Sequence, residues 1–254
     1  MLAHLIEISL KNRMLVLVGP PGVGKTFEML QEGHRLKRQG VDVVVGVVET
    51  HGRAETAALV DGLEAVPRRA VAYHGVTLEE MDTDAVLRRK PTVALVDELA
   101  HTNAPGGRFP KRYQDVEELL RAGVNVITTL NVQHLESLYD VVERFTGVKV
   151  KERVPDYLLG QAHQIVNVDV SAEDLVDRLR AGKVYPPDRA ERALAHFFTD
   201  ANLSRLRELA LEEIAARIDR RREQQGDTAA SGSDRVMVCL SSRGPNHHRL
   251  LRRG

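Results

Sequence analysis

Short apolar runs recur along the chain, and most of them are nearly continuous rather than alternating with polar residues. They occupy positions 14–18, 41–48, 93–96 and 124–128, with a weaker run at 70–73 and a later one at 164–170. Near-continuous runs of this length are typical of strands that are covered on both faces. The pattern therefore predicts a buried parallel sheet.

Segments between these runs carry apolar residues at helical spacing. We expect helices at 26–39, 115–121 and 135–145, and Thr77 with Glu80 has the spacing of a capping box at a further helix start. Strands that alternate with helices indicate an α/β fold in which helices cover both faces of a parallel sheet.

The later part of the chain is mainly helical. Helices are predicted at 172–181, 188–198 and about 202–224, and Ser171 with Asp174 marks the start of the first of them. Apolar residues form a stripe along the third: Leu203, Leu206, Leu209, Ala210 and Ile214. We therefore expect a helical C-terminal extension of one domain that covers residues 1–225.

Composition narrows the functional classes. The chain has 254 residues, with 36 Lys and Arg against 36 Asp and Glu, and Cys239 is its one cysteine. A net charge of zero argues against a dedicated nucleic-acid binder. No apolar run approaches the roughly 18 residues of a membrane span, and a single cysteine fits a reducing compartment. We expect a cytoplasmic chain with no nucleic-acid partner and no membrane span.

The strongest motif is the segment GPPGVGKT at 19–26, which follows an apolar strand and precedes a helix. It has the G-x-x-x-x-G-K-[ST] pattern of a phosphate-binding loop, in which backbone N–H groups converge on phosphate oxygens. Lys25 is predicted to contact the β- and γ-phosphates of ATP, and Thr26 to coordinate Mg²⁺. The predicted nucleotide-binding residues are Gly19, Gly22, Val23, Gly24, Lys25 and Thr26.

Two acidic residues follow the apolar run at 93–96. Because the carboxyl ends of parallel strands lie at one edge of a sheet, Asp97 is expected beside the phosphates as a Mg²⁺ partner. Glu98 is predicted as a base that orients an attacking water molecule, although an acidic pair at a strand end is also typical of a helix cap.

Polar residues follow the run at 124–128 as well. Asn131 or Thr129 is expected to sense the γ-phosphate, with capping of the next helix as the alternative for Asn131. The segment at 103–112, NAPGGRFPKR, opens on the same predicted edge. Its Arg108 is a further candidate phosphate ligand, and a solvated loop is the alternative.

Five segments together resemble the N-terminal cytoplasmic domain of the Kdp potassium-sensor histidine kinase (KdpD) family. They are GPPGVGKTFEML, VVETHGRAET, LVDELAHTNAPGGRFPKRYQDVEELL, TTLNVQHLESL and GKVYPPDRAERAL. The resemblance runs from about residue 10 to 224. It implies an ATP-binding regulatory domain of a two-component sensor that controls potassium uptake, with ATP and Mg²⁺ as cofactors and a kinase core, or another subunit of the system, as partner.

The resemblance also sets expectations for the end of the chain. Residues 226–234 are predicted to form a linker, and 235–254 resemble the start of a universal-stress-protein-like module that the chain leaves incomplete. Family members continue with membrane spans, which anchor them in the inner membrane, and a histidine-kinase core. We therefore expect no autophosphorylation by this chain.

Other functional classes fit the same loop. An independent P-loop ATPase or a small-molecule transferase would use Lys25 and Thr26 in the same way, and Glu98 leaves weak ATP hydrolysis open. Nothing in the sequence indicates an oligomeric state.

Overall fold

The computed structural model of the chain describes residues 13–185 and 187–224, and for 187–189, 192, 195 and 218–224 it describes the backbone alone. The predicted linker at 226–234 and the module start at 235–254 lie outside the described residues. The chain divides into two compact units: one holds Lys25–Leu130 together with the chain up to Leu15, and the other holds Val16–Gly24 and the chain from Asn131 onwards.

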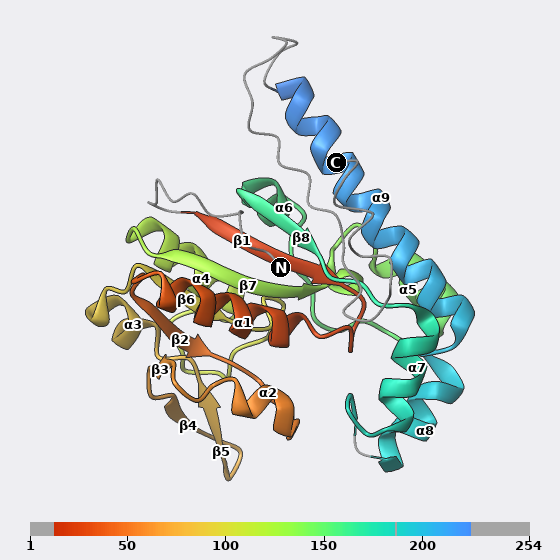
Figure 1. The fold of residues 1–254 in the computed structure, drawn as a ribbon, viewed down its shortest axis with the longest axis horizontal. Helices are drawn as coiled ribbons and strands as arrows, with labels where there is room; N and C mark the ends of the chain where they lie inside the picture. Colours follow the sequence, from red (N-terminus) through yellow and green to blue (C-terminus); the bar gives the residue numbers. More distant parts are fainter. Residues whose placement is uncertain (1–12, 186, 225–254) are drawn as a thin grey trace. The chain divides into compact units, whose positions relative to one another are not determined.

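The strands of the main sheet follow the order β3-β2-β6-β7-β1-β8 (Figure 1). Their bounds are β1 Met14–Gly19, β2 Val43–Val47, β3 Glu64–Ala65, β6 Val93–Val96, β7 Asn125–Asn131 and β8 Gln164–Asn167. Neighbours β3-β2, β2-β6 and β6-β7 pair in parallel. The α/β fold that the apolar runs predicted is confirmed.

Helices lie between the parallel strands and continue after the last of them. In the first unit they are α1 Lys25–Arg38, α2 Ala54–Ala58, α3 Thr83–Arg89 and α4 Arg112–Arg121. In the second unit they are the 3₁₀ turn η1 Val132–His134, α5 Tyr139–Thr146, α6 Tyr157–Gln161, α7 Ala172–Arg180, α8 Pro187–His196 and α9 Asp200–Gln224. None of the helices in the described ranges combines the length and the apolar composition that crossing a membrane requires.

The core of the first unit is built on β2 and β6, in which every residue is buried. Helix α1 packs on both strands. It approaches β6 so closely that a Cβ added at Gly33 would lie 2.6 Å from Leu95 Cδ1. Burial on both faces explains why these strands read as continuous apolar runs.

In the second unit, α9 packs on α5, α7, β8 and η1. Four residues of its predicted apolar stripe are buried: Leu203, Leu206, Leu209 and Ala210. Helix α7 begins as the sequence indicated, because the Ser171 side chain accepts a 3.0 Å hydrogen bond from the Asp174 N–H.

A separate antiparallel ribbon accounts for one wrong prediction. Strands β4 Arg69–Tyr73 and β5 Val76–Glu80 pair with each other and not with the main sheet (Figure 1). His74 and Gly75 join them with φ angles of 47° and 79°, as a tight two-residue hairpin turn requires. The capping box predicted at Thr77 and Glu80 is therefore a strand, and α3 is capped instead by Asp82, which accepts a 2.8 Å hydrogen bond from the Ala85 N–H.

The helix predicted at 135–145 begins later than expected. Leu135 is extended and forms an isolated bridge with Val154, and the Glu136 N–H donates to the Val154 carbonyl at 3.1 Å. This pairing holds Leu135 in extended backbone, a turn follows at 136–138, and α5 starts at Tyr139.

Lys90 provides a test of the local backbone. It caps α3 with a left-handed φ of 52°, a conformation that favours glycine. We expect Lys90→Gly to raise the free energy of unfolding by about 1 kcal/mol, measured by urea denaturation. The matched control is Arg88→Gly, inside the same helix and also exposed, which should lower it by about 1 kcal/mol. Equal destabilisation by both changes would contradict the left-handed backbone conformation assigned to Lys90.

Candidate functional site

The loop between β1 and α1 needs glycine at two positions. Gly22 and Gly24 have φ angles of 82° and 102°. A Cβ added at Gly22 would lie 2.9 Å from Val184 Cγ1, so a side chain has no room there. The Val23 carbonyl accepts a 3.1 Å hydrogen bond from Arg178 Nη1. The convergence of backbone N–H groups on a phosphate stays a prediction of the motif.

Lys25 and Thr26 follow directly as the first two residues of α1, and both side chains are buried. The first N–H groups of a helix lack intrahelical partners and carry a partial positive charge, so this position favours an anion. Burial lowers the pKa of Lys25 to about 7, with Asp97 acting in the opposite direction and Arg53 in the same direction.

Asp97, at the end of β6, is the centre of a polar cluster and is 1% exposed. Thr26 Oγ1 lies 3.2 and 3.1 Å from its two carboxylate oxygens, and Thr129 Oγ1 donates to Oδ1 at 2.5 Å. The Glu49 N–H donates to Oδ2 at 3.2 Å. Burial raises the pKa of Asp97 above its usual value, and these hydrogen bonds offset only part of that effect. The two residues predicted to hold Mg²⁺, Thr26 and Asp97, are thus in contact although 71 positions separate them.

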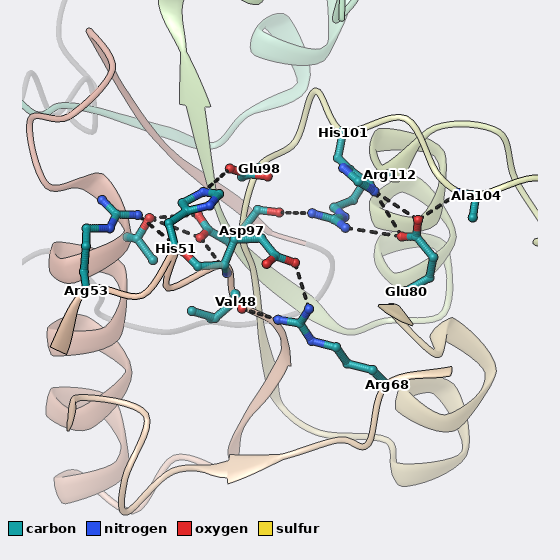
Figure 2. Close-up of polar contacts among 12 residues, drawn as sticks. Val48, His51, Arg53, Arg68, Glu80, Asp97, Glu98, His101, Ala104 and Arg112 are labelled. Carbon is teal, nitrogen blue, oxygen red and sulfur yellow. Dashed lines mark hydrogen bonds and ion pairs between the residues drawn. The ribbon is translucent and has the colours of Figure 1, made fainter. Parts of the chain in front are cut away.

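Glu98 has an unusual backbone and a specific partner (Figure 2). Its φ is 54°, its N–H donates to Thr129 Oγ1 at 3.0 Å, and its Oε1 lies 2.9 Å from His51 Nε2. Burial alone raises the pKa of Glu98, but the hydrogen bond and charge of His51 outweigh it, so the pKa lies below its usual value. The side chain is 36% exposed. Glu98 is therefore an ionised carboxylate within reach of solvent.

The side chain of Arg112 contacts the backbone of Asp97. It is fully buried, and its Nη1 donates to the Asp97 carbonyl at 3.1 Å. Its Nη2 lies 3.5 Å from Glu80 Oε2, and Glu80 also accepts a 2.8 Å hydrogen bond from the Ala104 N–H and contacts His101 Nε2 at 3.1 Å (Figure 2). Arg112 thus joins the end of β6 to the ribbon and to the segment 101–104.

Comparison with known proteins places the chain in a family. Residues 11–218 match the family described as KdpD, the osmosensitive K⁺ channel His kinase sensor domain. The chain belongs to this family.

Relatives from several bacteria carry the same domain. The sensor protein KdpD of Escherichia coli K12 is 57% identical over 198 residues, which cover 78% of this chain and 22% of that protein. The sensor protein KdpD of Mycobacterium tuberculosis H37Rv is 48% identical over 244 residues, covering 94% and 28%. A relative from Synechocystis sp. PCC 6803 is 54% identical, covering 92% and 63%. The chain therefore spans less than two thirds of the length of each of these relatives.

Among solved structures, the genome packaging NTPase B204 from Sulfolobus turreted icosahedral virus 2, in complex with AMP, aligns with a TM-score of 0.35 and 14% identity. The alignment covers 72% of this chain and 87% of that one. Similarity at this level supports no conclusion about the structure or the function of this domain.

Two predicted site residues, Arg108 and Asn131, take no part in the hydrogen bonds described above for the cluster around Asp97. Arg108 is 46% exposed and pairs with Asp84 Oδ1 at 2.9 Å and Glu118 Oε1 at 2.7 Å, on α3 and α4. Asn131 precedes η1 as its N-cap, and its side chain makes no capping hydrogen bond. The roles of Arg108 as a phosphate ligand and Asn131 as a γ-phosphate sensor in the KdpD domain stay predictions.

Sequence reasoning assigned no role to three residues that the KdpD fold brings to the Asp97–Glu98 pair. His51 contacts Glu98, and Arg53 lies close enough to Lys25 for its charge to lower the pKa of that lysine. Arg68 pairs with Glu49 at 2.9 Å. The sequence signals are position, because these residues follow the second apolar run, whose end lies beside Asp97, and for His51 and Arg53 also the family string VVETHGRAET.

Neighbouring threonines on β7 offer a matched test of the cluster. We expect Thr129→Val to lower the free energy of unfolding by about 2 kcal/mol, because Asp97 loses a buried donor and the Glu98 N–H loses its acceptor. Thr128 is also buried, but its hydroxyl has no hydrogen-bond partner among the described residues.

Thr128→Val should therefore raise the free energy of unfolding, by about 1 kcal/mol, since an unpaired polar group is removed without a change of shape. Urea denaturation of both variants measures the difference. Similar values for the two would show that Asp97 does not depend on Thr129.

Proposed function

We propose that the chain binds ATP·Mg²⁺ on the loop Gly19–Thr26 and acts as a nucleotide-dependent regulatory domain of a two-component osmosensitive potassium-sensor kinase that controls Kdp potassium uptake. The contact between Thr26 and the buried Asp97 carries this proposal. A hydroxyl and a carboxylate meet there beside a buried lysine, at the start of a helix. Oxygen ligands of these two types are those that Mg²⁺ prefers in phosphate sites.

Each residue of the site has a distinct role in the proposal. The N–H groups from Gly22 to Thr26 donate to phosphate oxygens, since Pro20 and Pro21 have no N–H. Lys25 supplies the cation for the β- and γ-phosphates, and Thr26 and Asp97 would hold the metal. When bound, Mg²⁺ neutralises part of the phosphate charge. Thr129 and the Glu49 N–H keep the Asp97 carboxylate oriented towards Thr26.

Membership of the family supports the regulatory part of the proposal. The matched family is a sensor domain, and the relatives from E. coli and M. tuberculosis are named sensor proteins. We propose that the nucleotide state of the domain is passed to a kinase core in the same signalling system. We further propose that residues 11–218 do not autophosphorylate, because the family resemblance assigns that reaction to the kinase core.

One observation favours a second function, an independent ATPase. Glu98 is ionised, follows Asp97 directly and is partly exposed, as a residue that orients water must be. Its contact with His51 keeps one carboxylate oxygen occupied. Slow hydrolysis would be compatible with a regulatory domain, and rapid hydrolysis would favour the enzyme.

Nucleotide binding is tested by calorimetry with ATP in the presence and absence of MgCl₂. We expect binding that Mg²⁺ strengthens, and a loss of about tenfold or more in Lys25→Ala, which removes a charge-assisted contact to phosphate. Lys149→Ala is the matched control, because Lys149 is exposed. The proposal fails if the unmodified chain binds no ATP or if Lys25→Ala binds it as tightly.

Phosphate release separates the regulatory function from the enzymatic one. We expect tight ATP binding with negligible turnover, and Glu98→Gln should leave the affinity within about twofold because Glu98 is not a phosphate ligand. The control is Glu79→Gln, the same change on the exposed ribbon. Rapid turnover that Glu98→Gln abolishes and Glu79→Gln preserves would assign an ATPase instead.

A further inference from the structure

The segment Glu49–Arg53, between β2 and α2, is fastened to the Asp97–Glu98 pair at two points. The Glu49 N–H donates to Asp97 Oδ2 at 3.2 Å, and His51 Nε2 lies 2.9 Å from Glu98 Oε1 (Figure 2). Arg68 adds an ion pair to Glu49 at 2.9 Å and a hydrogen bond to the Val48 carbonyl. This segment therefore has a defined position beside the proposed metal ligand and the proposed base.

Arg53, the last residue of the segment, has a guanidinium group that pairs with no acidic side chain among the residues that the structure describes. Its Nε donates to the Thr50 carbonyl at 3.0 Å and its Nη2 to the Glu49 carbonyl at 3.4 Å (Figure 2). In the described part of the chain no carboxylate lies within ion-pair distance of Arg53, and no hydrogen bond uses its Nη1. By contrast, Arg68 and Arg112 each pair with a glutamate.

The position of Arg53 brings a second cation to Lys25. The Glu49 N–H of the same segment shares the Asp97 carboxylate with Thr26, the residue that follows Lys25. A phosphate that approaches Lys25 is therefore attracted by the positive charge of Arg53 as well. A phosphate group is well suited, because a guanidinium fork can donate two parallel hydrogen bonds to its oxygens.

We infer that Arg53 is a second phosphate-binding cation, which contacts the terminal phosphate of a nucleoside triphosphate and makes the domain distinguish ATP from ADP. The terminal phosphate is favoured because the segment of Arg53 is fastened to Asp97 and Glu98, the residues proposed for the metal and the attacking water. The inference rests on the proposed function, since it needs a nucleotide on the loop Gly19–Thr26.

The same arrangement links the nucleotide to the segment Glu49–Arg53. Arg53 holds this segment through two of its own carbonyls, so a contact with the terminal phosphate stabilises the segment as well. Loss of that phosphate removes the contact with Arg53. ATP and ADP then differ in how firmly the segment, and with it the His51–Glu98 contact, is held.

The experiment compares the dissociation constants of ATP·Mg²⁺ and ADP·Mg²⁺ for four forms of the chain: unmodified, Arg53→Gln, Arg53→Lys and Arg68→Gln. We expect Arg53→Gln to weaken ATP about tenfold or more and ADP by less than about twofold. Arg53→Lys should recover part of the loss, because the charge remains but the fork is absent. Arg68→Gln loosens the same segment without removing the proposed phosphate ligand, so it should leave the ratio of the two constants unchanged.

Two results would overturn the inference: an equal loss of ATP and ADP affinity in Arg53→Gln, or a ratio that Arg68→Gln lowers as much as Arg53→Gln does. Either one would reduce Arg53 to a structural part of its segment. Failure of the proposed function looks different, because the unmodified chain would then bind neither nucleotide. Urea denaturation of each variant shows that the comparison concerns folded protein.

Discussion

The burial of one carboxylate organises the first unit of this domain. A charged group as deeply buried as Asp97 is costly unless hydrogen bonds replace its water, and its three donors come from separate elements. Thr26 lies in the first turn of α1, Thr129 near the end of β7, and Glu49 just beyond β2. The position of each is therefore fixed by the same group, so the helix start and the strand ends are held together by the need to satisfy Asp97. The surroundings of the proposed metal ligand and the stability of the unit depend on the same hydrogen bonds.

The burial of Arg112 imposes a similar constraint on a part of the chain outside the phosphate-loop motif. A fully buried guanidinium also needs partners, and it finds the Asp97 carbonyl on one side and Glu80 on the other. Glu80 in turn holds the Ala104 N–H, which ties the segment after β6 to the end of the ribbon. Removing Arg112 or Glu80 would leave the other charge buried without compensation. That change costs more free energy than the intact ion pair contributes to stability.

Much of the fold could be predicted from local patterns, because burial on both faces leaves a direct trace in the sequence. The runs at 41–48 and 93–96 are β2 and β6, and the juxtaposition of Thr26 with Asp97 follows from a glycine loop and a strand end in one parallel sheet. What could not be predicted depends on partners that are remote in sequence. Thr77 and Glu80 have helix-start spacing, yet cross-strand pairing with β4 makes them a strand. Arg108 has the composition of a phosphate ligand, but its ion pairs are with Asp84 and Glu118. The segment Glu49–Arg53 lies in the family string VVETHGRAET, but nothing in that string indicates contacts with Glu98 or Lys25, since only the fold brings them together.

The ribbon β4–β5 has a property that follows from its isolation. Tyr73, Val76 and Leu78 are exposed, and a lone two-stranded hairpin is at best marginally stable in water. Its one buried residue is Glu80, at the last position of β5, where the carboxylate meets Arg112. The ribbon is thus anchored at a single end, by the side chain that also connects with the Asp97 carbonyl. The position of the far end of the hairpin therefore depends on that one anchored end, since no residue at its tip is buried.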